Sequence, residues 1–288
     1  MTPITLHAPA KLNLTLEVLG RRRNGLHGLR SVMVPVDLFD ELVIYGKPRR
    51  FTVDPPNLER DNIVAQALQA LGLEVDAIGV SLRKHIPVGG GMGGGSSDAA
   101  ALLLAARRGM LPGSRSFDDL AAARALGSDV PFFLVETAAL VEQTGERVTA
   151  LGRPPQWHAI IVKPPVCVST AGAYAQIDTQ RPRVRPRKTS PSLAMAEALQ
   201  RAQFDRVVAL LENDFAGGAF ATYPEIAFAA HRLRAAGATH AALTGSGSCV
   251  FSLAADTRDQ QRILQRLDLP DGYTALTCTF WSGEGWMT

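Results

Sequence analysis

Alternating hydrophobic and polar residues recur through the first half of the chain and predict strands. Leu12, Leu14 and Leu16 alternate with polar residues, a period of two that is typical of a strand with one buried face. The same period places Lys11 and Asn13 together on the opposite face. Similar runs predict further strands at residues 31–37, 41–45, 51–53 and 78–82, and a hairpin of residues 138–143 and 147–151.

Capping signals and helical periodicity predict helices between and after these strands. Asp61 or Asn62 is placed to cap a helix that reaches Leu71, and Ser116 with Asp119 forms a capping signature for a helix that reaches Leu126. Further helices are predicted at residues 99–108, 170–177, 193–202, 204–211, 224–236 and 258–267, with strands at 157–162, 239–243, 249–253 and 273–280.

Strands and helices are mixed without strict alternation, which favours an α+β fold over a doubly wound sheet. The sequence GRPP at residues 152–155 is the best candidate for a domain boundary. We therefore expect an N-terminal domain of residues 1–152 and a C-terminal domain of residues 153–288. The stretch 178–191 is rich in proline and arginine and predicts a long loop.

Composition is that of an ordinary soluble globular protein. The 288 residues are 46% hydrophobic and 20% charged, with a net charge of +3. No apolar run is long enough for a membrane span and no secretory leader opens the chain, so we expect a cytoplasmic protein. Cys167, Cys249 and Cys278 are widely spaced, which predicts neither a disulfide framework nor a zinc site.

Basic residues concentrate in two turn-rich stretches, residues 21–23 and 181–188. Nucleic-acid contact is one interpretation. We favour solvated loops and no nucleic-acid partner, because no aromatic residues interleave with the arginines to stack on bases.

The segment PVGGGMGGGSSD at residues 87–98 carries the strongest functional signal. It follows a predicted strand and precedes a predicted helix. Glycines let backbone N–H groups approach a ligand closely, and the helix begins with unpaired N–H donors at the positive end of its dipole. Such a site binds anions, most often a polyphosphate. The predicted phosphate-binding residues are Pro87, Val88, Gly89, Gly90, Gly91, Met92, Gly93, Gly94, Gly95, Ser96 and Ser97.

Other phosphate loops fit this segment less well. A Walker A loop requires a lysine before its final Ser or Thr, and here Gly95 precedes Ser96 and Ser97. The match to a dinucleotide fingerprint is weak, because any run of glycines contains that spacing. A flexible linker is improbable between two well-patterned elements. The serines are also good helix caps, a role that is compatible with a contact to phosphate or Mg²⁺.

Three motifs in order resemble the kinase superfamily named after galactokinase, homoserine kinase, mevalonate kinase and phosphomevalonate kinase. They are APAKLNL at residues 8–14, the glycine loop, and LTGSGSC at residues 243–249. The resemblance covers nearly the whole chain and is densest before residue 145. It implies an N-terminal domain like ribosomal protein S5 domain 2, a ferredoxin-like C-terminal domain, and ATP and Mg²⁺ as cofactors.

The resemblance also implies catalytic residues. GSDVPFF at residues 127–133 is similar to the family segment that carries a catalytic aspartate, which makes Asp129 the acceptor of the substrate hydroxyl proton. Lys11 matches the catalytic lysine, and Asn13 would bind the substrate. By pattern alone, a turn or helix-cap aspartate is the better explanation of Asp129, and a solvated strand position is the commoner one for a lysine such as Lys11.

Within the superfamily the chain is most similar to a branch whose substrate is a cytidine diphosphate-linked methylerythritol. On that basis His27 would read the cytosine edge, Thr170 and Tyr174 would form the opposite wall of the pocket, and the loop at Gly245 and Ser246 would close the site. The family usually has a tyrosine where this chain has Leu26, so one aromatic contact with the base is missing.

The resemblance places Asn62 and Lys84 at the nucleotide, although a helix cap and an exposed strand end explain them equally well. Ser97 is the candidate metal contact. A kinase for mevalonate or homoserine, a catalytically silent nucleotide-binding protein and an NAD-dependent dehydrogenase remain as alternatives. His27 and Asp129 weigh against the first alternative, Lys11 and Asp129 weigh against the second, and the sequence context of the glycine loop disfavours the third. The sequence leaves open a monomer or a homodimer.

Overall fold

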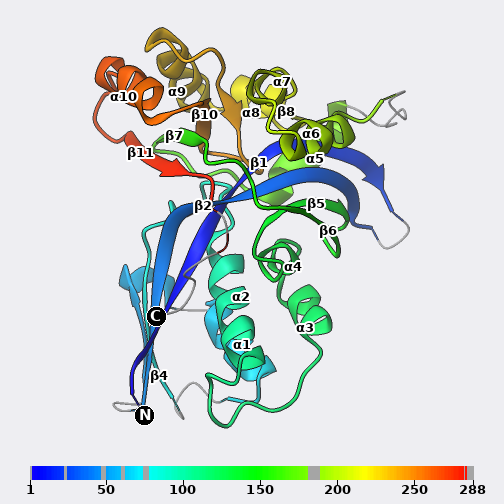
Figure 1. The fold of residues 1–288 in the computed structure, drawn as a ribbon, viewed down its shortest axis with the longest axis vertical. Helices are drawn as coiled ribbons and strands as arrows, with labels where there is room; N and C mark the ends of the chain where they lie inside the picture. Colours follow the sequence, from blue (N-terminus) through cyan, green and yellow to red (C-terminus); the bar gives the residue numbers. More distant parts are fainter. Residues whose placement is uncertain are drawn as a thin grey trace.

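The computed structural model describes residues 2–22, 25–46, 50–59, 62–73, 78–180, 189–281 and 283. Within them, two sheets and the helices packed on them form an α+β fold, as predicted (Figure 1). The alternative cap Asp61 and the basic stretch 181–188 lie outside the described residues.

Two long antiparallel strands, β1 (Ile4–Arg21) and β2 (His27–Tyr45), run through the first sheet from end to end (Figure 1). The first half of β2 pairs with β5 (Ala138–Gln143), and β5 pairs with β6 (Arg147–Gly152). The last five residues of β2 pair with β4 (Gly79–Arg83), which pairs with β3 (Phe51–Asp54). We predicted two strands, at residues 31–37 and 41–45, where β2 is one, since residues 38–40 continue the strand while its pairing partner changes from β5 to β4.

The middle of β1 is buried on both faces, whereas the alternation had predicted one buried face and one polar face exposed to solvent. Leu12 and Leu14 are buried on one side, and Lys11 and Asn13 are buried on the other. The polar face is therefore covered by protein, so its charged and amide groups must find partners inside the molecule.

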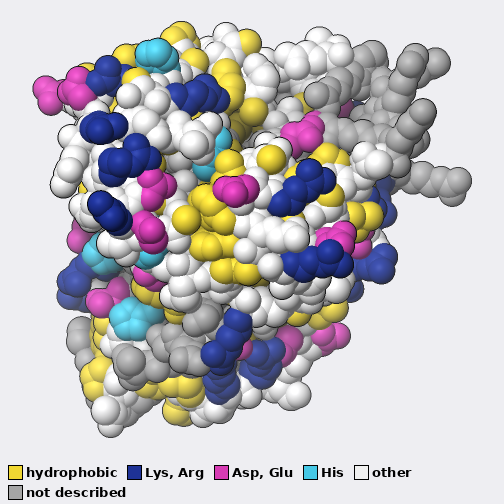
Figure 2. All heavy atoms as spheres, turned by 45° about the horizontal axis from the view of Figure 1, so that its top comes forward, with side chains coloured by type: hydrophobic (Ala, Val, Ile, Leu, Met, Phe, Trp, Pro, Cys, Tyr) yellow, Lys and Arg dark blue, Asp and Glu magenta, His cyan; other side chains and the backbone are white. Residues whose placement is uncertain are grey.

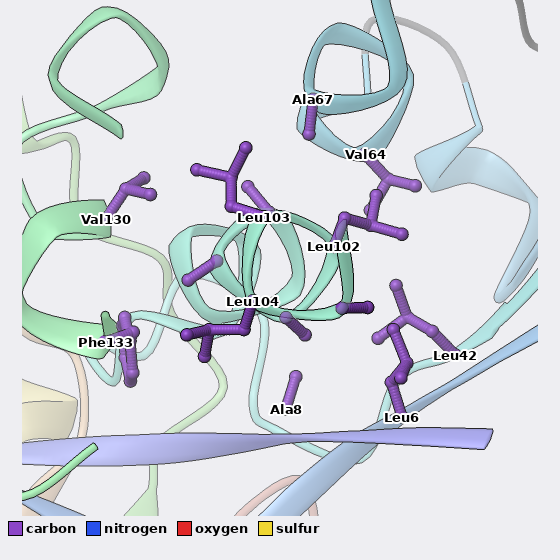
Figure 3. Packing of buried hydrophobic residues seen from close by; sticks show 14 of the residues in the cluster. Leu6, Ala8, Leu42, Val64, Ala67, Leu102, Leu103, Leu104, Val130 and Phe133 are labelled. Carbon is purple, nitrogen blue, oxygen red and sulfur yellow. The ribbon is translucent and has the colours of Figure 1, made fainter. Parts of the chain in front are cut away.

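Helix α2 (Gly94–Arg107) forms the centre of the N-terminal core. It packs against β1, α1 (Ile63–Ala70), α3 (Asp119–Leu126) and the short α4 (Val130–Phe133). Figure 3 shows Leu102, Leu103 and Leu104 pointing to different neighbours around this helix, including Val64 from α1 and Phe133 from α4. A helix of alanines and leucines that is apolar all round is suited to a fully buried position.

The second sheet has the order β11 (Thr274–Thr279), β7 (His158–Lys163), β10 (Val250–Ala254), β9 (Ala242–Leu243), and its pairs are antiparallel. Helices α9 (Pro224–Ala235) and α10 (Thr257–Arg266) pack on it. The remaining elements are η1 (Pro56–Leu58), α5 (Thr170–Gln180), α6 (Pro191–Gln200), α7 (Phe204–Ala209), β8 (Glu212–Asn213) and α8 (Ala216–Thr222).

The two parts of the chain interlock. Strand β8 pairs with β1 of the first sheet, and Phe280, just after β11, forms a bridge with Val36 of β2. The division between residues 152 and 153 stays a prediction. Residues before and after it pair with one another, at β1 with β8 and at Val36 with Phe280.

Several predicted helix starts were wrong for local reasons. Asp118, not Ser116, caps α3, because its carboxylate accepts hydrogen bonds from Leu120 and Ala121. Helix α2 begins at Gly94, inside the glycine run and five residues before the predicted start at residue 99. Helices α4 and α8 were not predicted.

The exterior carries charges of both signs. On the face in Figure 2, Lys and Arg side chains are interspersed with Asp and Glu. In the part of the chain that the structure describes, every helix is too short or too polar to cross a membrane.

Replacement of Leu103 by alanine should destabilise the protein by about 2–5 kcal/mol, since Leu103 is fully buried and its truncation leaves a cavity. Urea unfolding measures this change. Leu120→Ala is the matched control, because Leu120 is 40% exposed on α3 and should cost less than about 0.5 kcal/mol. Equal losses in the two variants would contradict the central place of α2 in the core.

Candidate active site

The glycine loop between β4 and α2 folds back on itself through glycines with positive φ. Gly89, Gly91 and Gly93 have φ of 67°, 76° and 74°, a region that other residues rarely adopt. At Gly91 a Cβ would lie 2.2 Å from the carbonyl oxygen of Thr244. Glycine is therefore required here because another backbone lies against the loop.

That second backbone is the loop between β9 and β10, as the sequence predicted. The Thr244 hydroxyl donates to the carbonyl of Gly91 at 3.3 Å, and the Ser248 N–H donates to that of Gly89 at 3.2 Å. The Cys249 N–H donates to the carbonyl of Gly90 at 3.1 Å. The two glycine loops thus lie side by side, although more than 150 residues separate them in the sequence.

A cavity of about 330 Å³ lies over the glycine loop at the head of α2. Unpaired N–H groups and the positive end of the helix dipole face an occupant there, which favours a phosphate. Its lining includes every predicted loop residue from Pro87 to Gly95, together with Asn57, Leu58, Asn62, Ile63, Ile86, Lys84 and Asp98.

Asn62 and Lys84 both line this cavity, but their side chains already have partners. Asn62 caps α1: its Oδ1 accepts from the Val64 N–H at 2.9 Å, and its Nδ2 donates to the carbonyl of Leu58 at 2.9 Å. The helix-cap interpretation is therefore correct for Asn62, whatever it also contacts. Lys84 is largely buried rather than at an exposed strand end.

Lys84 lies between two buried carboxylates, an arrangement that the sequence did not predict. Its ammonium pairs with Asp98 of α2 at 2.5 Å and with Asp40 of β2. Asp40 also accepts from the N–H groups of His85 and Ile86. Burial disfavours the charge of Lys84, but Asp98 and Asp40 raise its pKa above the usual value. Burial also raises the pKa of Asp98, with Asp40 adding to it and Lys84 opposing it.

The Lys84 contacts with Asp98 and Asp40 hold the residues before the glycine loop and the start of α2 against β2.

The two serines of the loop differ in position. Ser96 lines a second, larger cavity, whereas Ser97 is fully buried in the first turn of α2 and lines neither cavity. The Ser97 hydroxyl has no hydrogen-bond partner among the described residues.

Lys11 and Asp129 come together at the larger cavity, which has a volume of about 550 Å³. Their charged groups lie 3.6 Å apart. Burial lowers the pKa of Lys11, and the Asp129 carboxylate opposes this change. Asp129 precedes α4 but makes no cap hydrogen bond with its side chain. Asp129 therefore lies in a turn, as its pattern indicated, but its side chain is not a helix cap. The solvated position for Lys11 is wrong, because Lys11 is 2% exposed.

Asn13 connects this ion pair to the second glycine loop. Its Oδ1 accepts from the Lys11 ammonium at 2.5 Å and from the Gly245 N–H at 2.8 Å. Its Nδ2 donates to the hydroxyl of Ser31 at 2.8 Å. Asn13 therefore orients Lys11, and among the described residues one N–H of its amide is left for another partner.

The C-terminal part of the chain supplies the other wall of the larger cavity. Thr170 and Ser246 lie within hydrogen-bond distance, at 3.0 Å, and Gly245, Tyr174 and Phe215 also line this wall. Burial, together with the Asp129 charge, raises the pKa of Tyr174 to about 12, so its hydroxyl remains a donor at neutral pH.

His27 and Leu26 line an adjoining cavity of about 340 Å³, which shares Leu29, Ser128 and Tyr174 with the larger one. Leu26 is 55% exposed. The rings of His27 and Tyr174 are stacked, with centroids 4.5 Å apart. They form one wall rather than two opposite ones, because no base fits between rings already in contact.

Comparison with known proteins identifies the family of this chain. The models of the GHMP kinase N-terminal domain and the GHMP kinase C-terminal region match residues 62–137 and 195–269. A 4-diphosphocytidyl-2-C-methyl-D-erythritol kinase from Pelotomaculum thermopropionicum is 36% identical over 96% of this chain and 98% of its own length. The chain belongs to the 4-diphosphocytidyl-2-C-methyl-D-erythritol kinase family.

Other matches agree with this family assignment. The corresponding kinase of Neisseria meningitidis serogroup B is 34% identical, with 93% of this chain and 92% of the relative covered. A crystal structure of a 4-(cytidine 5'-diphospho)-2C-methyl-D-erythritol kinase superposes with a TM-score of 0.76 at 33% identity, covering 96% and 98% of the two chains. The L. major mevalonate kinase, at 14% identity and a TM-score of 0.68, shares the fold.

Most of the predicted site residues of this GHMP kinase meet around the joined cavities. Asp40, Asp98 and Phe215 were missed. Asp98 ends the glycine motif itself, so its position beside the loop was a usable signal. Asp40 and Phe215 lie in ordinary strand and turn sequence, and only the packing of distant elements brings them to the site.

We expect Gly95→Val to weaken the binding of a non-hydrolysable ATP analogue by more than about tenfold, equivalent to about 1.4 kcal/mol. Gly95 lines both main cavities and has an ordinary helical backbone, and its added Cβ would meet only Ile63, at 3.5 Å. The valine therefore intrudes on the phosphates without strain. Calorimetric titration measures the affinity.

The matched control is Gly217→Val, since Gly217 lies in α8 with nothing within 4 Å of its Cβ position. It should bind the analogue normally. Gly93 is unsuitable because its φ is 74° and a Cβ there would lie 3.0 Å from Phe133. Unchanged affinity in a folded Gly95→Val protein would mean that the phosphates lie elsewhere.

Proposed function

We propose that this enzyme transfers the γ-phosphoryl group of ATP to the 2-hydroxyl of 4-diphosphocytidyl-2-C-methyl-D-erythritol, a step of non-mevalonate isoprenoid precursor biosynthesis. The observation that carries the proposal is the Lys11–Asp129 pair, which lies in one cavity with the glycine loop. The family assignment supports the choice of substrate. Both substrates are soluble small molecules, and we place the reaction in the cytoplasm, by a monomer or a homodimer.

Asp129 is placed to accept the hydroxyl proton as the new phosphorus–oxygen bond forms and the bond to ADP breaks. Phosphoryl transfer depends mainly on positioning and charge stabilisation. The Lys11 ammonium pairs with the Asp129 carboxylate and adds positive charge beside the reacting oxygens. Thr170, Ser246 and Tyr174 provide hydroxyl groups along the side of the cavity where the acceptor substrate would lie.

We propose Mg²⁺ as the metal that accompanies ATP. Among the described residues no group of three His, Cys, Asp or Glu side chains is placed to hold an ion. Mg²⁺ in kinases is bound by few protein oxygens and by the phosphates themselves, so the absence of a protein cage fits its chemistry. The Ser96 hydroxyl, which lines the larger cavity, is a better candidate ligand than the enclosed Ser97.

Incubation with ATP, Mg²⁺ and 4-diphosphocytidyl-2-C-methyl-D-erythritol should produce ADP and the 2-phosphate in equal amounts, detected by coupled assay and by ³¹P NMR. Mevalonate and homoserine serve as competing acceptors. Preferential phosphorylation of either would assign the chain to another activity, and ATP binding without turnover would indicate a silent protein.

Asp129→Asn should lower kcat by about 10²–10⁴-fold, the usual effect of losing a general base. The KM for ATP should change little, because Asp129 lines the larger cavity but not the one over the glycine loop. Steady-state kinetics give both constants. Asp205→Asn is the control, since Asp205 is an exposed aspartate in the first turn of α7. Near-normal turnover in Asp129→Asn would rule out its role as the base.

Leu26→Tyr should lower the KM for the cytidine substrate with little effect on kcat, as an interaction made equally in ground and transition states does. Leu26 is exposed at the edge of the cavity beside His27, and a base stacked on an aromatic ring gains roughly 1–3 kcal/mol. The control is Leu193→Tyr, at an equally exposed leucine on α6. An unchanged KM would mean that the base does not lie over residue 26.

A further inference from the structure

Asp178 of α5 lies at the edge of the cavity beside His27, and neither the family resemblance nor the mechanism gives it a role. Its Oδ1 is 2.7 Å from Nε2 of His27, across 151 residues of sequence. Asp178 also lines the cavity of about 340 Å³ that contains Leu26 and His27. The contact joins the second half of α5 to the first residue of β2.

The imidazole is held on two sides. Tyr174, one helical turn before Asp178, stacks on its face at an interplanar angle of 15°. The His27 side chain is only 9% exposed. A ring that is stacked and bonded at one nitrogen cannot rotate to exchange its two nitrogens, so the remaining nitrogen, Nδ1, has a fixed direction. Among the described residues, the hydrogen bond of the His27 ring is the one at Nε2.

A carboxylate accepts hydrogen bonds and does not donate them, so it favours the tautomer with the proton on Nε2. Nδ1 then carries a lone pair and acts only as an acceptor. A cytosine ring offers an amino group at position 4, which donates, whereas uracil offers a carbonyl oxygen there, which does not.

We propose that Asp178 is a positioning residue that fixes His27 as the Nε2–H tautomer, so that Nδ1 selects a cytosine over a uracil base. This inference rests on the proposed function for the identity of the substrate. It adds the residue that makes the site prefer cytosine over uracil. With the proton held on Nε2, Nδ1 of His27 can accept a hydrogen bond from the amino group of cytosine. With uracil, the lone pair of Nδ1 would face the lone pairs of the carbonyl oxygen and repel them.

The test compares the cytidine substrate with its uridine counterpart in the wild type, Asp178→Ala and Asp178→Glu. The wild type should prefer cytidine. Asp178→Ala frees the tautomer, so the preference in kcat/KM should fall about tenfold, the value of one hydrogen bond made or lost. The uridine substrate should improve while the cytidine substrate weakens, and kcat at saturating cytidine substrate and KM for ATP should not change. Asp178→Glu should restore most of the preference.

Long-range ¹H–¹⁵N correlation spectra of the His27 imidazole show which ring nitrogen carries the proton. A purely structural role of Asp178 would leave this pattern unchanged. The wild type should show a proton on Nε2 of His27 alone, and Asp178→Ala should show a mixture of tautomers. His27→Gln identifies the signals. Thr179→Ala is the matched control, because Thr179 is the next residue on α5 and, among the described residues, its hydroxyl bonds only to the carbonyl of Ala175. It should leave both the preference and the spectrum unchanged.

Three results would overturn the inference: an unchanged preference in Asp178→Ala, equal losses for both substrates, or a proton on Nδ1 in the wild type. If the wild type phosphorylates neither nucleotide substrate, the proposed function is wrong instead. The spectra still decide the tautomer in that case, so the two failures can be told apart.

Discussion

The contact between two glycine backbones decides how this molecule is built. The loop that ends at α2 and the loop between β9 and β10 approach so closely that a Cβ at Gly91 would overlap the carbonyl oxygen of Thr244. Hydrogen bonds from Thr244, Ser248 and Cys249 hold the two loops together. The phosphate-binding loop and the wall of the substrate cavity are therefore parts of one rigid feature.

The buried charges of the site lie around the same pair of loops. The glycine loop lies against Lys11, whose N–H donates to the Met92 carbonyl. Lys11 is thereby removed from water and requires a partner, which Asp129 and Asn13 supply. On the other side of the glycine loop, Lys84 is buried between Asp98 and Asp40. Breaking either cluster would leave an unpaired buried charge, which is strongly destabilising. Each cluster therefore helps to hold the loops and the start of α2 in place at the site.

Local patterns predicted much of the fold and of the site. The alternation in β1 correctly placed Lys11 and Asn13 on one face, and the hairpin of β5 and β6 was predicted at its observed turn. Short segments such as α4 and α8 were missed, because tertiary packing rather than intrinsic propensity stabilises a helix of one or two turns. Ser97 was predicted as a phosphate-loop residue but lies within α2 and is enclosed, since the helix begins three residues before it.

The amino-acid sequence alone determined the class of chemistry. Glycines before a helix indicate a phosphate site wherever they occur, since the requirement for positive φ and for unpaired N–H groups is local. Only the tertiary structure decided which groups act together. Asp178 reaches His27, Asp40 reaches Lys84, and the rings of His27 and Tyr174 meet, across distances in sequence that no local pattern spans. The physical reason is that partners of buried charges and rings are chosen by the packing of whole elements, and that packing depends on the entire chain.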